Sequence, residues 1–261
     1  MTSSPEPISV CGYTITPFTP GQLVQHILGM LRAKKGGWIL ALNLDLVARG
    51  VREPSYSALI KDADITVADG HPLVWAMKKN GSHDEVLQRC TGSDLTQKLL
   101  HIIPPLDCCI IGGKNPRQAL INEGLDPAGG WSIFDGMVTI GPEIVESLKP
   151  YLEGRHLVFL ALGVPKQEQL IQLLKPHYPE TIFIGVGGSF EFLAGITNRA
   201  PQWMQDRGLE WLYRLASEPK RLWRRYLVEY VPGAIELLKD VRRNKKLRRK
   251  KSSNVQAETS E

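Results

Sequence analysis

The chain has 261 residues, 43% of them hydrophobic, and its 24 glycines and 18 prolines are ordinary for a folded protein. This composition excludes a collagen-like or broadly disordered chain, and the length predicts either one large domain or one domain plus an appendage. The formal net charge of +5 is unevenly spread, because residues 199–251 contain 16 Lys and Arg against 6 Asp and Glu, and the remainder contains 16 against 21. We therefore expect the C-terminal part to meet an anionic partner, such as a membrane, a nucleic acid or a phosphorylated substrate.

No segment has the pattern of a signal peptide or a membrane span. Residues 1–13 lack a basic region followed by an apolar run, and no apolar run reaches the ~18–20 residues of a spanning helix. The cysteines are Cys11, Cys90, Cys108 and Cys109, without C-x-x-C spacing. This usage favours reduced thiols in a cytoplasmic protein and no zinc site.

Short apolar runs alternate with helical patterns through residues 1–198. The predicted strands are 38–43, 65–69, 107–113, 131–135, 157–163 and 181–187. The predicted helices are 21–34, 55–60, 72–79, 93–102, 116–122, 142–152 and 166–175. This alternation predicts a Rossmann-like α/β core, in which helices cover both faces of a mostly parallel sheet.

Residues 199–251 are predicted to form a basic helical appendage, because the strand pattern stops there and three prolines, Pro201, Pro219 and Pro232, divide the segment into helices. Arg221, Arg224 and Arg225 lie close together opposite an apolar stripe, and such like charges repel unless an anion or solvent relieves them. Residues 242–251 are basic except Asn244 and Leu247, which suits nucleic acid, nuclear localisation or an anionic membrane surface. The polar residues 252–261 are expected to be disordered.

Ligands of parallel α/β sheets bind at the carboxyl ends of the strands. The residues predicted there are Asn43, Asp45, Asp69, Gly112, Gly113, Asp135, Gly136 and the turns 165–168 and 187–189. Asp69 is a candidate general base, with capping of the following helix as the alternative. His71 is a rival base, although Pro72 directly after it favours a structural histidine.

Two turns are candidate phosphate contacts. Lys166 follows Pro165 at a predicted helix start, which suits a phosphate but also describes an ordinary strand-to-helix turn. The turn 185–190 departs from G-x-G-x-x-G because Phe190 replaces the last glycine, which disfavours a dinucleotide-dependent oxidoreductase. Asp62 and Asp64 match a D-x-D motif at the amino end of their strand, so we interpret them as loop carboxylates and predict no required metal.

Several motifs, in this order, resemble the WecG/TagA/CpsF family of bacterial glycosyltransferases. They are ADG at 68–70, GSDL at 92–95, IIGG at 110–113, DG at 135–136, LGVPKQE at 162–168, GVGGSFEFLAG at 185–195, RAP at 199–201, and GLEWLYRL with EPKRLWRRY within 208–226. The resemblance spans about residues 40–226, and PKQE, GVGG and GLEWLYRL are its most specific elements.

The resemblance implies an inverting enzyme that needs no metal or other cofactor. Such an enzyme moves a hexose or N-acetylhexosamine from a UDP-sugar (of the UDP-ManNAc, UDP-ManNAcA or UDP-Glc type) to a saccharide on polyprenyl diphosphate. It works on the inner face of the cytoplasmic membrane, as a peripheral protein, in the synthesis of surface polysaccharide, exopolysaccharide or teichoic acid. Self-association of the core is compatible with the resemblance, and a nucleic-acid partner is not expected.

The resemblance also implies roles for individual residues. Asp69 is the base that removes the proton of the acceptor hydroxyl. Arg214, Arg221 and Arg224 or Arg225 fold over the site and stabilise the departing diphosphate. The substrate-binding candidates, from these motifs and from the strand ends, are Asn43, Arg89, Gly112, Gly113, Asp135, Gly136, Lys166, Gln167, Glu168, Gly187, Gly188, Ser189 and Arg199. Ala41 stands where many relatives have Thr, which leaves the donor sugar open.

Two other classes of protein are compatible with parts of the sequence. A non-enzymatic nucleotide-binding protein with a nucleic-acid-binding tail is the main alternative, because the tail is so basic. A Rossmann-like oxidoreductase is the third hypothesis, and the missing glycine fingerprint argues against it.

Overall fold

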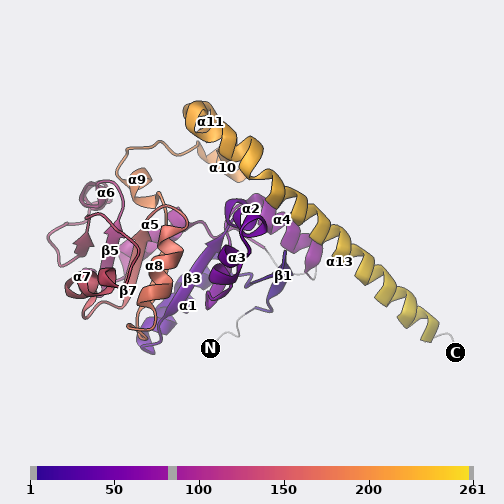
Figure 1. Ribbon diagram of the computed structural model, residues 1–261, viewed down its shortest axis with the longest axis horizontal. Coiled ribbons are helices and arrows are strands. Elements are labelled where there is room, and N and C mark those ends of the chain that lie inside the picture. The colour runs from indigo at the N-terminus through magenta and orange to yellow at the C-terminus, as the bar shows by residue number, and fades with distance from the viewer. Residues whose placement is uncertain (1–4, 82–86, 259–261) are drawn as a thin grey trace.

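The computed structural model describes residues 5–81 and 87–258, and its core is a six-stranded parallel sheet with the order β4-β3-β8-β7-β5-β6 (Figure 1). The strands are β3 (Gly37–Leu42), β4 (Ile65–Ala68), β5 (Cys108–Gly112), β6 (Ser132–Phe134), β7 (Leu157–Ala161) and β8 (Ile182–Gly185). The predicted α/β fold and all the predicted strands are confirmed, with small differences at the strand ends.

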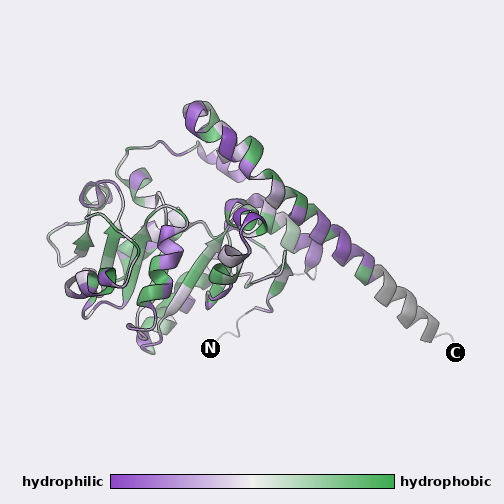
Figure 2. Ribbon diagram, in the orientation of Figure 1, coloured by the Kyte–Doolittle hydropathy of each residue, from purple (hydrophilic) through white to green (hydrophobic). Residues whose placement is uncertain are grey.

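The central strands are apolar without alternation because both faces of the sheet are covered. Successive residues of β7 belong to opposite core clusters: Leu157 and Phe159 face one layer of helices, and Val158 and Leu160 face the other. Figure 2 shows these strands as continuously hydrophobic, whereas the helices are two-sided. A parallel sheet buried on both faces requires this pattern.

Every predicted helix of the core is present. These helices are α1 (Pro20–Arg32), α3 (Pro54–Lys61), α4 (His71–Asn80), α5 (Gly92–Ile102), α6 (Pro116–Asn122), α7 (Glu143–Leu152) and α8 (Lys166–Leu174). Local sequence explains their starts; α1, for example, begins with a capping box in which Thr19 and Gln22 bond each other's backbone N–H groups.

Three features were not predicted: the hairpin of β1 (Ile8–Val10) and β2 (Tyr13–Ile15), helix α2 (Leu44–Arg52) and the short helix α9 (Ser189–Leu193). Helix α2 matters most for the site, because it starts directly after β3 with no glycine or proline between them. Its N-cap is Asn43, whose Oδ1 accepts hydrogen bonds from the N–H groups of Asp45 and Leu46 at 3.0 and 3.1 Å.

The C-terminal region is helical, as predicted. Its elements are α10 (Gln202–Asp206), α11 (Glu210–Ser217), α12 (Pro219–Arg224), the π-helical turn η2 (Arg225–Glu229) and α13 (Val231–Glu258). Pro232 lies in the first turn of α13, where proline is tolerated. Helix α13 includes residues 252–258, which differs from the disorder expected there, and residues 259–261 lie outside the described part.

The first half of α13 packs against the α/β body. Gly233 lies against Ala48 of α2, Leu237 belongs to the core cluster, and Asp240 accepts a hydrogen bond of 2.7 Å from Asn80 of α4. Beyond these contacts the helix runs past α4 and β1 and projects from the body (Figure 1). Part of the appendage is therefore integrated in the core rather than attached to it.

None of the described helices has both the length and the apolar character that crossing a bilayer requires.

Candidate functional site

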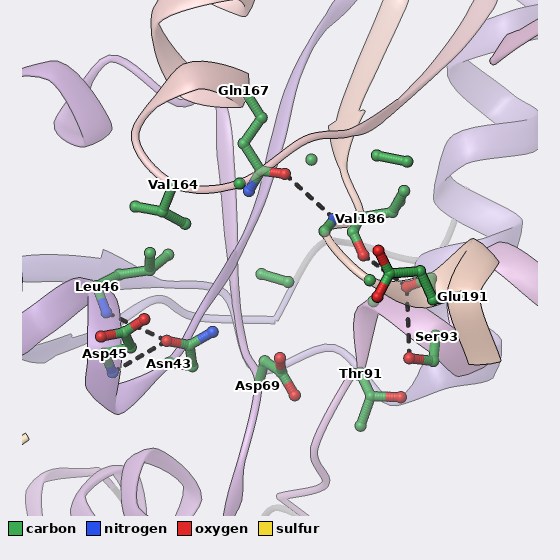
Figure 3. A pocket seen from close by; sticks show the side chains of 18 of the residues that line it. Asn43, Asp45, Leu46, Asp69, Thr91, Ser93, Val164, Gln167, Val186 and Glu191 are labelled. Carbon is green, nitrogen blue, oxygen red and sulfur yellow. Dashed lines mark hydrogen bonds between the residues drawn. The ribbon is translucent and has the colours of Figure 1, made fainter. Parts of the chain in front are cut away.

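An open pocket of about 520 Å³ lies at the carboxyl ends of β4, β3, β8 and β7, with α11, α12 and η2 contributing the opposite wall. Figure 3 shows Asp69 between Asn43 on one side and Thr91 and Ser93 on the other, with Gln167 above them. The ends of β5 and β6 lie outside the pocket, since these strands come last in the strand order.

Asp69 is the central titratable group of this pocket. Burial raises its pKa to about 6 and Glu210 adds to the rise, while Arg214, Arg89 and the Asn43 side chain oppose it. The structure does not support the capping alternative, because Gly70 is the N-cap of α4 and no side chain caps that helix. A carboxylate whose pKa lies near neutrality is suited to accept a proton.

Asn43 and Ala41 line the pocket from the end of β3. The Oδ1 atom of Asn43 is engaged by α2, and its amide nitrogen is directed toward the side on which Asp69 lies (Figure 3). Ala41 provides no hydroxyl, but Thr91, Ser93 and Thr197 line the same pocket and carry one each.

Three of the predicted appendage arginines line the pocket, and each is paired with a carboxylate. Arg214 contacts Glu210 at 2.6 Å, Arg221 contacts Glu218 at 2.5 Å, and Arg225 contacts Asp45 of α2 at 2.6 Å.

The two alternatives of the prediction, Arg224 and Arg225, lie differently, and only Arg225 lines the pocket. The Arg224 side chain is 74% exposed and lies outside the pocket lining, 3.7 Å from Glu229. The π-helical turn, closed by a bond of 3.0 Å from the Tyr230 N–H to the Arg225 oxygen, widens the backbone at this point.

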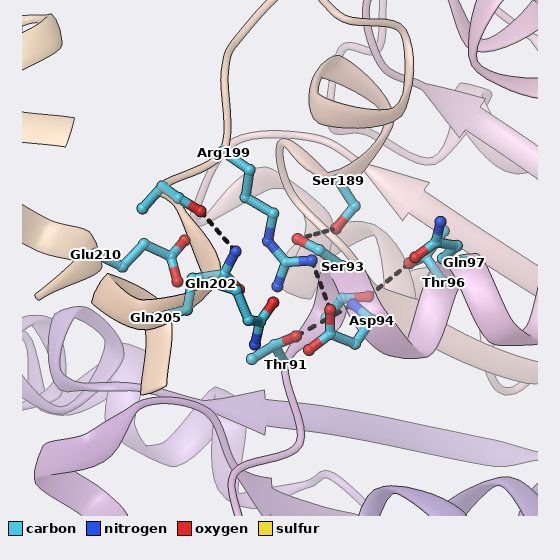
Figure 4. A network of polar contacts seen from close by, with 12 residues as sticks. Thr91, Ser93, Asp94, Thr96, Gln97, Ser189, Arg199, Gln202, Gln205 and Glu210 are labelled. Carbon is cyan, nitrogen blue, oxygen red and sulfur yellow. Dashed lines mark hydrogen bonds and ion pairs between the residues drawn. The ribbon is translucent and has the colours of Figure 1, made fainter. Parts of the chain in front are cut away.

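Arg199 belongs to a polar network that connects the appendage to α5 (Figure 4), and Arg89 contacts Gln205 and Glu210 of the appendage. Arg199 lines the pocket and contacts Asp94 at 2.5 Å, while the Asp94 N–H donates to Thr91. Arg89 does not line the pocket; it contacts Glu210 at 3.4 Å and Gln205 at 3.4 Å. Its influence on the site is electrostatic, through the pKa of Asp69.

Gln167, Glu168 and Gly187 form a short hydrogen-bonded chain in the pocket wall, which Gln167 and Gly187 line. The Gln167 Nε2 donates to the buried Glu168 carboxylate at 2.8 Å, so its Oε1 faces the Gly187 N–H and accepts a bond of 3.1 Å. Gly185 leaves room for this side chain, because a Cβ there would lie 2.9 Å from Nε2. Glu168 itself does not line the pocket.

The other residues of the glycine turn line the pocket. Gly187 and Gly188 present backbone to it, and Ser189 does so with a hydroxyl that already donates to the Val186 oxygen at 2.6 Å and lies 3.4 Å from Ser93.

Several predicted substrate contacts do not line this pocket: Gly112, Gly113, Asp135, Gly136 and Lys166. Gly112 and Gly113 have positive φ angles of 77° and 83°. A side chain at Gly112 would collide with Leu162, and one at Gly113 would press against Ala161 and Phe190. Backbone conformation and tight packing therefore explain both glycines. The Lys166 Nζ lies 3.5 Å from the carbonyl oxygen of Val138.

The two rejected sequence candidates also have structural partners. His71 of α4 bonds the Gln205 carbonyl oxygen through Nε2 at 2.9 Å and packs against Gly208. These two contacts join α4 to the appendage. Asp64 accepts from the Trp38 N–H and contacts Lys175 at 2.6 Å. Among the described residues, no group of three or more His, Cys, Asp or Glu side chains is placed to hold a metal.

Four charged residues line the pocket that were not predicted from the sequence: Glu210, Glu218, Arg49 and Arg52. Glu210 and Glu218 stand within the quoted motifs, beside the arginines that they pair with. Their i+3 and i+4 spacing from Arg221 and Arg214 was the available signal.

A doubly covered parallel sheet, with a carboxyl group of raised pKa and paired arginines at its carboxyl edge, is the arrangement of an α/β enzyme. The model of the Glycosyl transferase WecG/TagA/CpsF family matches residues 8–247. The chain belongs to this family and is a glycosyltransferase, as its motifs predicted. A glycosyltransferase uses a sugar donor and an acceptor, and membership of this family supports a role in cell-surface polysaccharide synthesis. The non-enzymatic and oxidoreductase hypotheses are set aside.

Proposed function

We propose that this glycosyltransferase moves a hexose or N-acetylhexosamine from a UDP-sugar to a saccharide carried on polyprenyl diphosphate, with inversion at the anomeric carbon. One observation carries the proposal: Asp69, with its pKa raised to about 6, shares a pocket with Arg214, Arg221 and Arg225 of the appendage. Such a transfer releases a proton from the acceptor hydroxyl and builds negative charge on the departing UDP. A base can take the proton, and a set of cations in the same pocket can stabilise the negative charge.

In the proposed reaction, the acceptor hydroxyl oxygen forms a bond to the anomeric carbon as the bond from that carbon to UDP breaks. Asp69 accepts the hydroxyl proton, and UDP leaves with the electron pair of the broken bond. Arg214 and Arg221 then meet the growing negative charge, once the diphosphate takes the place of Glu210 and Glu218 beside them.

No metal is required in this proposal, because the guanidinium groups supply the positive charge that a divalent ion would otherwise provide. EDTA should therefore leave the transfer rate unchanged, and strong inhibition that a divalent ion reverses would contradict metal independence.

The proposed place of work is the inner face of the cytoplasmic membrane, to which the enzyme binds peripherally. Tryptophans on the appendage support this location, since Trp203, Trp211 and Trp223 are 54%, 44% and 52% exposed beside basic residues. Exposed aromatic and apolar side chains flanked by arginines suit the interface of an anionic bilayer.

Asp69→Asn tests the proposed base. We expect the transfer rate to fall by about 10²–10⁴-fold while UDP binding is retained, because the amide cannot accept the proton. In the wild type, kcat/KM should fall as the pH drops through about 6 and level off above it, since only the ionised form of Asp69 acts. Initial rates and UDP calorimetry measure both quantities.

Asp135→Asn is the matched control, because Asp135 also precedes a glycine at a strand end but lies outside the pocket. It should transfer at the wild-type rate.

Asp69→Asn should also raise the melting temperature above pH 6 but not below pH 4. The folded state disfavours the charged carboxyl of Asp69, so the wild type loses stability as the pH rises through the raised pKa, and the variant does not. Normal turnover by Asp69→Asn would eliminate Asp69 as the base.

A further inference from the structure

Six arginines line the pocket, and one of them differs from the rest. Five contact carboxylates within 4.0 Å: Arg49, Arg199, Arg214, Arg221 and Arg225. Arg52 instead donates to the main-chain oxygen of Glu229, and no carboxylate among the described side chains, those of residues 5–81 and 87–248, forms an ion pair with it. Its charge is therefore the one in the pocket lining that no described acidic side chain balances.

Arg52 belongs to the part of the pocket that α2 and η2 form. It ends α2 and contacts Glu229 of η2, and Arg225 of η2 pairs with Asp45 in the first turn of α2. Asp45 and Asn43 lie on one side of Asp69 in Figure 3. Arg199 and Ser189 gather with Thr91 and Ser93 on the opposite side (Figure 4). The pocket therefore has a second cationic position, separate from the 187–189 turn.

Exposed apolar residues adjoin this second position. Glu229, whose oxygen Arg52 contacts, follows Leu227 and Val228, which are 59% and 52% exposed. Val231 and Ile235 continue the apolar surface along α13, with 43% and 47% of their areas exposed. An unbalanced cation next to an apolar strip fits a ligand that has an anionic group and a hydrocarbon chain.

We propose that Arg52 binds the diphosphate of the lipid-linked acceptor and that the first isoprenoid units of this lipid lie over Leu227 and Val228. This inference rests on the proposed function and deepens it. The reaction brings two diphosphates into one pocket, and their mutual repulsion requires separate cationic positions. Placing them on opposite sides of Asp69 brings the acceptor hydroxyl to the face of the sugar opposite the leaving UDP, as inversion demands.

Binding of farnesyl diphosphate tests the site directly. In saturating UDP, we expect the wild type to bind this probe in calorimetry and to bind uncharged farnesol far more weakly. Arg52→Gln keeps a hydrogen-bond donor for the Glu229 oxygen but removes the charge, and should weaken binding of the diphosphate by about tenfold or more. Arg52→Lys restores the charge and should retain most of the affinity.

Arg32→Gln is the matched control, because Arg32 also stands in the last turn of a helix and donates to a main-chain oxygen, that of Leu28, at 3.2 Å. It should bind the probe as the wild type does. With a short-chain lipid-diphosphate acceptor, Arg52→Gln should raise the KM for the acceptor and leave the KM for the UDP-sugar unchanged.

Displacement of farnesyl diphosphate by UDP would overturn the inference, because the two ligands would then share one site. Equal affinity of Arg52→Gln and the wild type would overturn it as well. If the wild type binds farnesyl diphosphate through Arg52 but transfers sugar from no UDP-sugar, the acceptor site stands and the proposed function is wrong.

Discussion

Asp69 and Glu168 are both carboxyl groups whose pKa burial raises, yet they occupy different positions. Asp69 lines the pocket, whereas Glu168 is almost completely buried behind Gln167 and accepts its hydrogen bond. Glu168 thereby determines which way the Gln167 amide points, and Gln167 in turn holds the Gly187 N–H. Glu168 is therefore a positioning residue rather than a substrate contact.

Removal of the Glu168 carboxyl tests this role. Glu168→Ala frees the Gln167 amide to rotate, so UDP should bind about tenfold more weakly and the KM for the UDP-sugar should rise, with a smaller change in kcat. Glu168→Gln still offers an acceptor oxygen to Gln167 and should retain UDP affinity. Calorimetry and initial rates report both variants.

The comparison between the two Glu168 variants separates positioning from folding. Glu168→Gln removes a charge whose burial the folded state disfavours, so it should raise the melting temperature at neutral pH. Should Glu168→Ala keep full UDP affinity in a folded protein, the hydrogen-bonded chain to Gly187 would have no part in donor binding.

Among the elements, α13 links the appendage to the catalytic core. Its close approach to α2 depends on Gly233, where an added Cβ would lie 2.8 Å from both the Cβ and the backbone nitrogen of Ala48. Helix α2 carries Asn43 at its cap and Asp45 in its first turn, so α13 braces the helix that presents these side chains to the pocket.

Gly233→Ala should therefore destabilise the protein by about 1–3 kcal/mol, because two packed helices would have to separate. Denaturant unfolding measures this change. The control is Gly29→Ala in α1, where nothing lies within 4 Å of the added methyl group. That substitution should be neutral or stabilise by up to about 1 kcal/mol through helix propensity. If both substitutions stabilise the chain, the contact between α2 and α13 is looser than the geometry indicates.

At the scale of the whole molecule, charge is segregated along the projecting helix. The basic run 242–251 lies on α13 beyond the residues that pack against α2, and within it Arg248 donates to the main-chain oxygens of Asn80 and Gly81 at the end of α4. Positive charge carried away from an acidic core can contact an anionic surface without exposing the core to it.

Deletion of residues 242–261 should reduce binding to vesicles that contain phosphatidylglycerol, by about 1 kcal/mol for each basic residue in contact with the surface. Cosedimentation at increasing salt measures this, and binding should weaken as salt screens the charges. Vesicles of phosphatidylcholine alone are the control. Tight DNA binding that anionic vesicles cannot displace would instead favour a nucleic-acid partner for this tail.

Local patterns explain why so much of the fold could be predicted. The apolar runs of β7 and β8 are long enough to be strands and too apolar for any exposed face, and Pro116 and Pro219 stand at the starts of the helices they were expected to begin. Helix α2 was missed because Asn43, its N-cap, is the one residue between β3 and α2, so no glycine or proline marks a turn between the two elements.

The sequence by itself determined the parallel α/β core, the helical basic appendage and, through its motifs, the glycosyltransferase family. Only the tertiary structure decided which residues line the pocket, because the order of strands in a sheet is a non-local property. Gly112 and Asp135, at the ends of β5 and β6, lie outside the pocket, whereas Arg52 at the end of α2 lines it. It also decided that Glu168 supports Gln167. The pairing of Asp45 in α2 with Arg225 in η2 was likewise decided by the tertiary structure, since an ion pair between distant segments leaves no periodic trace in the sequence.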